Sequence, residues 1–426
     1  MNVLLIFLLK IISRSIRTLN LGNGSTWPGH LMLFLQPHFI SSELAFSKTK
    51  VIFIIGTNGK TTTSKLLKTI LKKNNFTVIQ NTSGANLMNG IASALISNAN
   101  VNGKITADFA LFEIDENIFP LIVKEITPSY IVLLNLFRDQ LDRYGEVRTI
   151  IEKWKKTVSS LPQEVILICN GDDPQIAYLG SNSNHVVKYF GLDKAESLPS
   201  DSFSSDSLFC PKCFHKLTYS VTYFSHLGKY YCKHCSFKRP KVDLTNAIFY
   251  PLPGTYNEYN ILASELTAKS IGIPNENIEN GLKSFKPAFG RQEIIQIGNK
   301  KVQIFLSKNP TSFNQSLQTI QKLNAKHILF CLNDRIPDGR DISWIWDTDL
   351  SLLNTCPHIY VSGDRVYDMA LRIKYEGIKD VTIVQNIEIE LTEVLKSLPD
   401  NETLYILPTY TAMLEIRKII LGKKIL

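Results

Sequence analysis

Short apolar runs alternate with stretches of helical periodicity between residues 51 and 190. Such runs predict buried strands, and a helix between successive strands gives the βαβ rhythm of a mostly parallel sheet. The pattern therefore predicts an α/β domain. Its expected strands are Val51–Ile55, Thr77–Gln80, Asp108–Ile114, Ile131–Asn135, Val165–Cys169 and Val186–Phe190, and its expected helices include 63–71, Ile91–Ser97 and Ile150–Val158.

The rhythm stops at Ser197–Ser207, a segment rich in Ser and Asp, and a helix is predicted at 261–271. A second α/β series, which indicates a Rossmann-like C-terminal domain, begins near Val302. We expect an N-terminal helical segment 1–46, a central domain 47–297 with an insertion at about 201–240, and a C-terminal domain 298–426. The second series predicts strands at Val302–Leu306, His327–Leu332, His358–Val361, Val381–Val384 and Leu404–Leu407, and helices at Phe313–Leu323, Val366–Tyr375, Ile389–Leu398 and Thr411–Ile420.

The first residues, Met1–Ile12, are strongly apolar and are interrupted only by Asn2 and Lys10. This run is too short to span a bilayer, which needs about 20 residues. It also lacks the preceding positive charge and the cleavage site of a signal peptide. We expect a helix that packs on the domain or touches a membrane surface, and packing is the preferred interpretation.

A glycine-rich turn follows the first predicted strand and leads into a helix. This order forms a phosphate cradle, because glycines let backbone N–H groups approach phosphate oxygens and a helix N-terminus carries partial positive charge. We expect Lys60 to reach the β- and γ-phosphates, and Thr61 or Thr62 to hold Mg²⁺. The spacing is shorter than in the usual Walker pattern. The turn consists of Gly56, Thr57, Asn58, Gly59, Lys60, Thr61 and Thr62.

Composition places the chain among globular proteins with large cores, since 44% of its 426 residues are hydrophobic and 20% are charged. The formal net charge of +9 favours an anionic partner, such as a nucleotide, a nucleic acid, a phospholipid surface or pyrophosphate. The 7 cysteines do not form a disulfide framework, so a reducing cytoplasm is expected.

Two C-x-x-C pairs, Cys210/Cys213 and Cys232/Cys235, have the separation of a Cys₄ zinc ribbon. Such a zinc ion could be catalytic, could serve nucleic-acid binding, or could be a structural clip. Four thiolates leave no open coordination position, so we prefer a structural Zn²⁺. His215 and His234 lie beside the cysteines and are not expected to be ligands.

The sequence of residues 56–62, Gly-Thr-Asn-Gly-Lys-Thr-Thr, resembles the ATP site of the Mur ligase family and of the related folylpolyglutamate synthases. Those enzymes convert a carboxylate to an acyl phosphate, and an amine then displaces the phosphate. The resemblance implies that Glu113, at the end of a predicted strand, binds Mg²⁺. Gln140 stands where the family has a metal-binding histidine, so no second Mg²⁺ site is assigned.

Further stretches resemble Mur ligase motifs and occur in the family's order. The turn Asn170–Asp173 matches one near the nucleotide, and 254–260 matches an adenine-side motif. Residues 290–293 match Gly-Arg-x-Glu, whose arginine helps to bind ATP phosphates. The resemblance therefore adds to the ATP site the positions Asn257, Asn260, Arg291 and Lys308.

Four C-terminal segments carry a further resemblance: Lys308–Pro310, Asn333–Asp347 with its Asp338-Gly339-Arg340-Asp341, Ser362–Arg365 and Pro408–Thr411. Together with the cysteine pairs and the glycine-rich turn, they resemble the MurT-type subunits of lipid II isoglutaminyl synthase, from about Leu21 to Leu421. The resemblance implies ATP-dependent amidation of the α-carboxylate of D-glutamate in the lipid II stem peptide. Ammonia would come from a separate glutaminase subunit of the GatD type. No cysteine here lies in the Gly-x-Cys-x-Gly context of such a glutaminase nucleophile.

Asp338 and Asp341 carry two interpretations. In the family an aspartate of the synthase subunit completes the glutaminase Cys-His pair, and Asp341 is the preferred candidate. Alternatively, Asp341 caps the helix that follows it. At the level of the whole chain, the alternatives are an amino-acid-adding Mur or folylpolyglutamate-type ligase, and a nucleic-acid-binding NTPase that uses its zinc ribbon. We expect no nucleic-acid partner, because helicase-like motifs do not follow the phosphate cradle.

Overall fold

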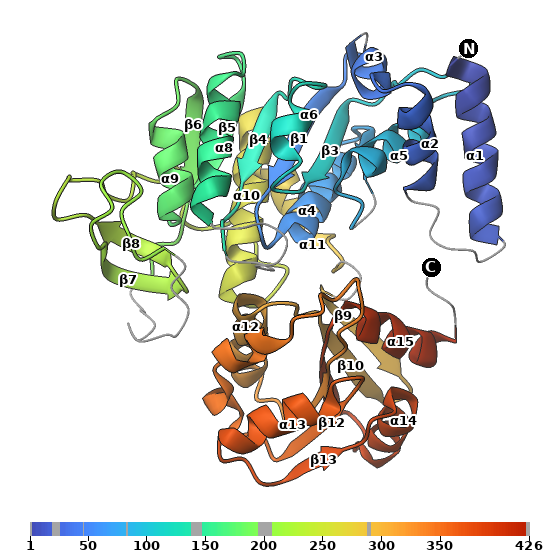
Figure 1. Cartoon of the computed structure of the whole chain (residues 1–426), viewed down its shortest axis with the longest axis vertical. Coiled ribbons are helices and arrows are strands. Elements are labelled where there is room, and N and C mark those ends of the chain that lie inside the picture. Colours follow the sequence, from blue (N-terminus) through green and yellow to red (C-terminus); the bar gives the residue numbers. More distant parts are fainter. Residues whose placement is uncertain are drawn as a thin grey trace.

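The structure is a computed structural model that describes residues 2–18, 26–45, 47–81, 84–137, 147–194, 207–287 and 291–422. Figure 1 shows two α/β domains, one above the other, with a two-stranded hairpin at one side of the upper domain and helix α1 at the other. Both α/β series predicted from the sequence are present.

A six-stranded sheet of order β2-β3-β1-β4-β5-β6 forms the central domain. All of its neighbouring strands are parallel. The chain runs from β1 past β3 to β2, returns to β3, and then passes over β1 to β4, so the carboxyl ends of β1, β3 and β4 flank the position where open α/β sheets bind ligands. The strands are β1 (Lys50–Ile55), β2 (Val78–Gln80), β3 (Phe109–Ile114), β4 (Tyr130–Leu133), β5 (Ile166–Asn170) and β6 (Val186–Phe190).

Helices cover both faces of this sheet, which explains why its central strands are continuously apolar. The core on one face includes residues of α5 (Met88–Asn98), α6 (Phe119–Ile122), α8 (Val147–Ser159) and α9 (Pro174–Ser181). The core on the other includes residues of α4 (Lys60–Lys73), α10 (Thr255–Ile271) and α11 (Asn275–Lys283).

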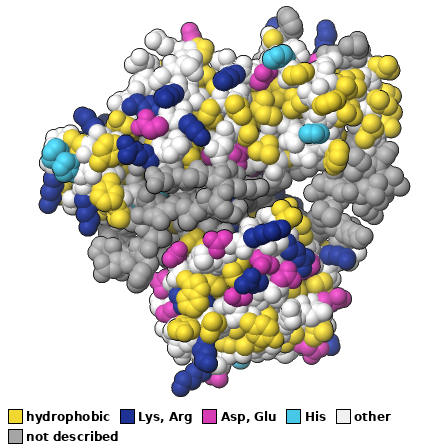
Figure 2. Space-filling model, viewed as in Figure 1, with side chains coloured by type: hydrophobic (Ala, Val, Ile, Leu, Met, Phe, Trp, Pro, Cys, Tyr) yellow, Lys and Arg dark blue, Asp and Glu magenta, His cyan; other side chains and the backbone are white. Residues whose placement is uncertain are grey.

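Three helices precede the central sheet: α1 (Asn2–Thr18), α2 (Trp27–Leu35) and α3 (Phe39–Ala45). Ile6 and Leu9 of α1 are buried in the core, so the packing expected for this segment is present. The other side of α1 and α2 exposes large apolar side chains, and Figure 2 shows hydrophobic atoms gathered at this end of the molecule. No helix among the described residues is long and apolar enough to cross a membrane.

The C-terminal domain contains a second six-stranded sheet of order β13-β12-β11-β14-β10-β9. Only β9 runs antiparallel to its neighbour. Because β9 belongs to this sheet, we propose a domain boundary before residue 291 instead of the sequence-based boundary at 298. The strands are β9 (Arg291–Ile297), β10 (Lys300–Phe305), β11 (His327–Cys331), β12 (His358–Ser362), β13 (Val381–Ile383) and β14 (Thr403–Pro408).

One face of the second sheet packs against α12 (Pro310–Lys322), α13 (Val366–Tyr375) and the 3₁₀ helices η1 (Ser343–Asp347) and η2 (Leu350–Leu353). The other face packs against α14 (Ile387–Ser397) and α15 (Tyr410–Leu421).

The segment between β6 and α10 contains the antiparallel strands β7 (Thr218–Phe224) and β8 (Leu227–Tyr231), which we call the ribbon hairpin. The cysteine pairs flank it, one before β7 and one after β8. Apolar residues of the hairpin join the core formed by α4 and α10. The insertion is therefore packed on the central domain and does not stand apart from it.

Candidate nucleotide-binding and ligase site

The glycine-rich turn lies between β1 and α4, at the carboxyl end of the sheet. Gly59 has φ +91°, and a Cβ there would lie 2.1 Å from the Asn260 side-chain oxygen. Gly56 has φ +147°, and a Cβ there would lie 2.9 Å from the backbone oxygen of Asn135. Only glycine fits both positions, so the two motif glycines allow the turn to pack closely on β4 and α10.

Asn135, just beyond β4, fixes the conformation of this turn. Its Oδ1 accepts from the backbone N–H of Asn58 at 2.9 Å, and its Nδ2 donates to the Asn58 carbonyl at 3.0 Å. The Thr57 hydroxyl donates to the Phe137 carbonyl and accepts from the Phe137 N–H, each at 3.1 Å. The turn is thus held in place by the segment that follows β4.

The two predicted Mg²⁺ ligands lie together. The Thr61 hydroxyl donates to Oε2 of Glu113 at 2.7 Å, and the Glu113 side chain is buried. A carboxylate and a threonine hydroxyl at the start of a phosphate-binding helix are the hard oxygen ligands that Mg²⁺ takes in nucleotide sites. This pair fits the ion that the motif implies.

Asn81 holds the backbone of Glu113, a role that sequence reasoning missed. It accepts from the Glu113 N–H and donates to the Glu113 carbonyl, both at 2.9 Å, and also donates to the Ala85 carbonyl at 2.8 Å. Asn81 follows β2, so only the adjacency of β2 and β3 brings it to this position. No short motif marks it in the sequence.

Lys60 lies over the turn, with its amine 2.5 Å from the Gly56 carbonyl and 3.3 Å from the Glu116 carboxylate. Burial raises the pKa of Glu116 above its usual value of 4.5, while the Lys60 amine opposes this rise. The Lys308 amine acts in the same direction as Lys60. Lys308 follows β10, so a C-terminal cation lies within electrostatic reach of this carboxylate.

A pocket extends from the turn to the interface between the two domains. Asn257 and Asn260 of α10 line it, and the Asn260 amide donates to Oδ1 of Asn257 at 3.3 Å. Gln292 of β9 lines it too, with φ +58° and a buried Oε1 that has no hydrogen-bond partner among the described residues. The remaining lining residues are Asn58, Gly59, Thr62, Asn135, Phe224, Leu227, Tyr256, Tyr259, Phe305, Leu306, Ser312, Gln315 and Ser316.

Two predicted positions are not described at the level of the side chain. Gln140 lies within 138–146, outside the described residues, and only the backbone of Arg291 is described, as the first residue of β9. Neither prediction gains or loses support from the geometry.

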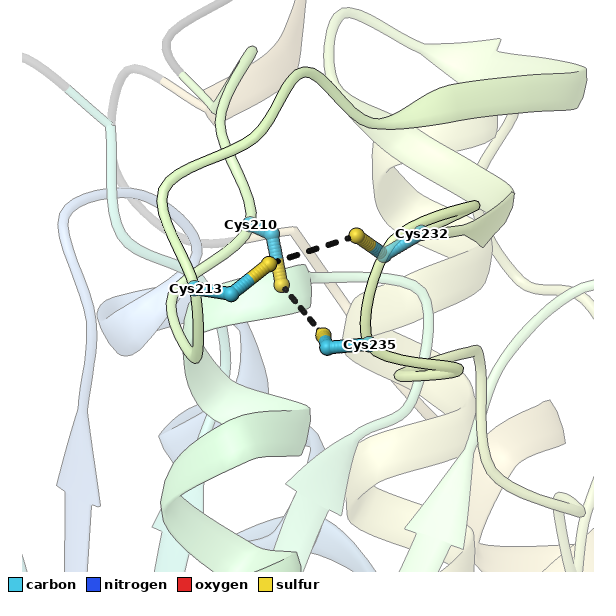
Figure 3. Close-up of side chains that lie close together, drawn as sticks. All are labelled: Cys210, Cys213, Cys232 and Cys235. Atoms are coloured by element: carbon cyan, nitrogen blue, oxygen red, sulfur yellow. Dashed lines mark hydrogen bonds between the residues drawn. The ribbon is translucent and has the colours of Figure 1, made fainter.

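The four cysteines of the ribbon converge (Figure 3). Sγ of Cys210 lies 3.5 Å from that of Cys235, and Sγ of Cys213 lies 3.5 Å from that of Cys232. All four sulfurs lie within 4.8 Å of one another. Zn–S bonds of about 2.3 Å in a tetrahedron require sulfur separations of about 3.8 Å. The donor set therefore fits a Cys₄ zinc ion.

His215 and His234 stack beside this cluster with ring centroids 3.6 Å apart, and both are exposed. They can form a second group with Cys213, whose ligand atoms also lie within 4.8 Å of theirs. The four thiolates already complete a tetrahedron, so the histidines are not needed as ligands.

Asp338 and Asp341 lie in the C-terminal domain, and neither lines the described pocket. The exposed Asp341 accepts from the Ser343 N–H at 2.8 Å, at the start of η1, and this bond lowers the pKa of its carboxyl. Asp338 is buried and accepts from the Thr411 N–H at 2.7 Å and from its hydroxyl. The N-cap residue of the 3₁₀ helix η1 is Ile342, and it has no side-chain cap, so the helix cap considered for Asp341 is not formed; Asp341 closes the turn just before η1, while Asp338 anchors α15.

Comparisons with known proteins agree with this fold. A family model described as Mur ligase middle domain matches residues 54–268, and one described as MurT ligase C-terminal matches 306–413. A pseudomurein peptide ligase type C from Methanothermus fervidus superposes with a TM-score of 0.66 at 24% identity, over 88% of this chain and 79% of that one. The protein is an ATP-dependent ligase of the Mur type.

Curated relatives define the branch of the family. The chain is 33% identical to the lipid II isoglutaminyl synthase (glutamine-hydrolyzing) subunit MurT of Staphylococcus aureus (strain COL), over 85% of each chain. It is 34% identical to the subunit of the same name from Streptococcus pneumoniae (strain ATCC BAA-255 / R6), over 95% of this chain and 94% of the relative. The chain belongs to the MurT family.

Proposed function

We propose that this chain amidates the α-carboxylate of D-glutamate in the lipid II stem peptide, giving D-isoglutamine in peptidoglycan synthesis. A carboxylate oxygen attacks the γ-phosphorus of ATP, and ADP leaves. Ammonia then attacks the acyl carbon, loses a proton, and expels phosphate. The pairing of Thr61 with Glu113 beside Lys60 carries this proposal, because it supplies the phosphoryl-transfer machinery in a member of the MurT family.

The residues of the site have different proposed roles, according to where they lie. The backbone of the turn 56–60 and the Lys60 amine bind the phosphates, and Asn257 and Asn260 line the nucleoside side of the pocket. Thr61 and Glu113 would hold Mg²⁺, and that ion would supply positive charge opposite the transferred phosphoryl group. Arg291 and Lys308 add positive charge from the C-terminal side, so closure of the two domains on ATP would complete the site.

Ammonia must come from elsewhere. The relatives' names describe a subunit of a glutamine-hydrolysing enzyme. Cys169 and Cys331 are buried, and burial raises the pKa of both thiols, which is the reverse of what a nucleophile needs. We propose a glutaminase partner of the GatD type, with the exposed Asp341 orienting its catalytic histidine.

The Cys₄ cluster is proposed to hold a structural zinc ion. Its thiolates come from both sides of the ribbon hairpin, so the metal closes this segment on itself. All four coordination positions are filled by protein, so the ion has no position for a substrate.

We further propose that the exposed apolar side of α1 and α2 lies against the membrane surface that carries lipid II. Large exposed apolar side chains gather there, and the net charge of +9 favours anionic lipid. Sedimentation with anionic vesicles tests this: a Phe7→Ser, Phe34→Ser double variant should remain in the supernatant while the unchanged protein pellets. The side chains concerned are Leu4, Phe7, Leu8, Ile11, Trp27, Leu31, Phe34 and Leu35.

The decisive experiment for the reaction uses the chain purified with a glutaminase partner, lipid II, glutamine and ATP. Mass spectrometry of lipid II should show that one hydroxyl has been replaced by an amino group, with ADP formed in equal amount. A product that has gained an amino-acid residue would establish the amino-acid-adding alternative. Salt-sensitive binding to single-stranded DNA without any change in lipid II would establish the nucleic-acid-binding alternative.

A further inference from the structure

The tip of the ribbon hairpin lines the pocket between the two domains. Phe224 ends β7 and Leu227 begins β8, and the two are paired across the tip. Both are at least nine-tenths buried, and both line the pocket together with Asn58 and Gly59 of the phosphate-binding turn. The zinc-ribbon segment therefore contributes directly to the surface of the site that we assign to ATP.

We propose that Phe224 and Leu227 form an apolar wall for the nucleoside of ATP, and that the Cys₄ cluster sets nucleotide affinity by holding this wall in place. The inference rests on the proposed use of the pocket for ATP. The phosphates take the polar end at the glycine turn, where N–H groups and Lys60 lie. An aromatic ring and a leucine suit the base and ribose instead.

The tip is anchored to the same segment that holds the phosphate-binding turn. His226, between Phe224 and Leu227, is 1% exposed, and its ring lies 4.6 Å from the ring of Phe137. Phe224 also contacts Phe137, with ring centroids 5.2 Å apart. Phe137 is the residue that exchanges two hydrogen bonds with Thr57. The hairpin tip and the turn are therefore parts of one packed unit.

Two adjacent carboxylates extend this unit. Nε2 of His226 lies 3.3 Å from Oδ2 of Asp173, and the same oxygen accepts from the Leu136 N–H at 2.8 Å. Asp173 lies in the Asn170–Asp173 turn, which resembles the turn that lies near the nucleotide in Mur ligases. Asp173 therefore acts on the proposed nucleotide site indirectly, because it positions the hairpin tip and the segment after β4.

Asp172 joins the hairpin to α10. Its carbonyl accepts from the Gly228 N–H at 3.0 Å, next to Leu227 in the pocket wall. Its carboxylate pairs with Arg239, just after the second cysteine pair, and accepts from the Tyr259 hydroxyl at 2.8 Å. The buried Asp172 carboxylate therefore joins the ribbon segment, through Arg239, to α10, through Tyr259. Tyr259 directly precedes Asn260, which lines the pocket.

The cysteine pairs lie at the opposite end of the hairpin from its tip. Cys210 and Cys213 precede β7, and Cys232 follows β8 directly. A two-stranded hairpin is marginally stable on its own, and a bound metal ion contributes its binding energy to folding. Holding both strand ends at one ion therefore stabilises the hairpin register that brings Phe224 and Leu227 into the wall.

Nucleotide binding tests the wall without any need for turnover. Dissociation constants would be measured by calorimetry for ADP and for inorganic tripolyphosphate. Phe224→Ala should weaken ADP binding about tenfold, the effect of losing one good aromatic contact, and leave tripolyphosphate binding unchanged. Tyr231→Ala is the matched control, because Tyr231 lies on the same hairpin, is 40% exposed and does not line the pocket. It should leave both constants unchanged.

The zinc part of the proposal has its own readout. Treating the full-length protein with a chelator, with zinc loss confirmed by metal analysis, should weaken ADP binding by a similar factor and spare tripolyphosphate binding. Restored zinc should restore ADP affinity. Unchanged ADP affinity in a zinc-free protein would overturn the link to the metal.

Phe224→Leu keeps most of the buried volume, so this variant tests the apolar wall if Phe224→Ala does not fold. A several-fold loss for ADP alone supports the wall. Unchanged ADP affinity, or equal losses for ADP and tripolyphosphate, would overturn it. A failure of the amidation proposal is separate, because a protein that does not amidate lipid II would still show this ADP-specific loss.

Discussion

The Thr61 hydroxyl donates a hydrogen bond of 2.7 Å to the Glu113 carboxylate, joining the start of α4 to the end of β3. Parallel pairing places the two strand ends side by side, since Ile55 of β1 lies opposite Ile114 of β3. The two residues are 52 positions apart in the sequence, and the sheet topology alone makes them partners. Their geometry leads to the first prediction.

Glu113→Gln should lower ATP-dependent amidation by about two orders of magnitude or more, because an amide keeps the shape but loses the charge that binds Mg²⁺. The Mg²⁺ concentration for half-maximal rate should rise. Thr61→Ala should shift the same curve, whereas Thr61→Ser, which keeps the hydroxyl, should shift it little. A normal Mg²⁺ dependence in both Glu113→Gln and Thr61→Ala would remove these residues from the metal site.

Lys60→Ala should abolish phosphoryl transfer while the fold remains intact, because its amine lies over the turn and not in a core. The measurement is ADP formation with lipid II and saturating MgATP, alongside circular dichroism. Lys65→Ala is a suitable control, since Lys65 lies five residues further along the same helix and donates to the Pro287 carbonyl. Near-normal ADP formation by Lys60→Ala would contradict its role.

Glu116 leads to a prediction about pH. Burial raises the pKa of this carboxyl above 4.5, so the folded protein holds its proton more tightly than the unfolded chain does. Stability must therefore fall as pH rises from about the usual glutamate value through the raised one. Glu116→Gln does not titrate, so its melting temperature relative to the unchanged protein should increase across that window. A difference that stays constant or decreases with pH would show that burial is not the dominant effect.

Asn81→Leu should destabilise the fold by about 2–3 kcal/mol, because it removes the two hydrogen bonds that Asn81 makes to the buried backbone of Glu113. Urea unfolding measures this change. Asn98→Ala is the control, since the one bond of the Asn98 amide among the described residues goes to the carbonyl of Ala94 within its own helix. If the two variants lost equal and small amounts of stability, the proposed support of Glu113 would be wrong.

Cys210→Ser or Cys232→Ser should lower both the zinc content and the melting temperature, because a site with three thiolates binds zinc less tightly. Metal analysis and thermal unfolding of the purified variants provide the test. His215→Ala serves as the comparison and should retain zinc, since the four sulfurs alone complete the tetrahedron. Full metal retention with unchanged melting in both cysteine variants would argue against a Cys₄ ion.

The elements with strong apolar periodicity were predictable from the sequence. β6 and α13 have the predicted bounds, and most other strands differ by one or two residues. The helix α11 was missed because only Ile278, Gly281 and Leu282 of its residues are buried, which is too few to give a clear period. β9 was missed because it is an edge strand whose pattern acquires meaning only through its pairing with β10.

The residues of the candidate site also fall into two groups, those recognisable from the sequence and those found only in the structure. The glycine turn and the cysteine pairs were recognisable from local spacings, and Glu113 was named from the resemblance to Mur ligases; the structure brings Glu113 to Thr61 and the four sulfurs together. Asn81 and His226 were not recognisable, because their roles come from strand adjacency and from the packing of the insertion on the sheet. Local patterns indicate the groups proposed to bind the ligand, and only the tertiary structure reveals the groups that position them.

Substitution of Asp341 tests whether this chain contributes a residue to the active site of its proposed glutaminase partner. Its carboxylate is exposed and makes one described hydrogen bond, to the Ser343 N–H. Asp341→Asn keeps the side-chain shape, and asparagine accepts the same kind of turn bond from the backbone two residues further on. If Asp341 only closes the turn before η1, the variant should amidate normally with either nitrogen source.

If Asp341 orients the partner's histidine, glutamine-driven amidation should fall by about two orders of magnitude or more, by analogy with a triad aspartate. Free ammonia should then restore the rate, because the acyl-phosphate chemistry uses Lys60 and Glu113 and is untouched. Asp338→Asn is the contrasting variant: Asp338 is buried and anchors Thr411, so its loss should lower stability and reduce both rates together. Equal losses with glutamine and with ammonia in Asp341→Asn would show that Asp341 supports the fold or the ATP site instead of the partner.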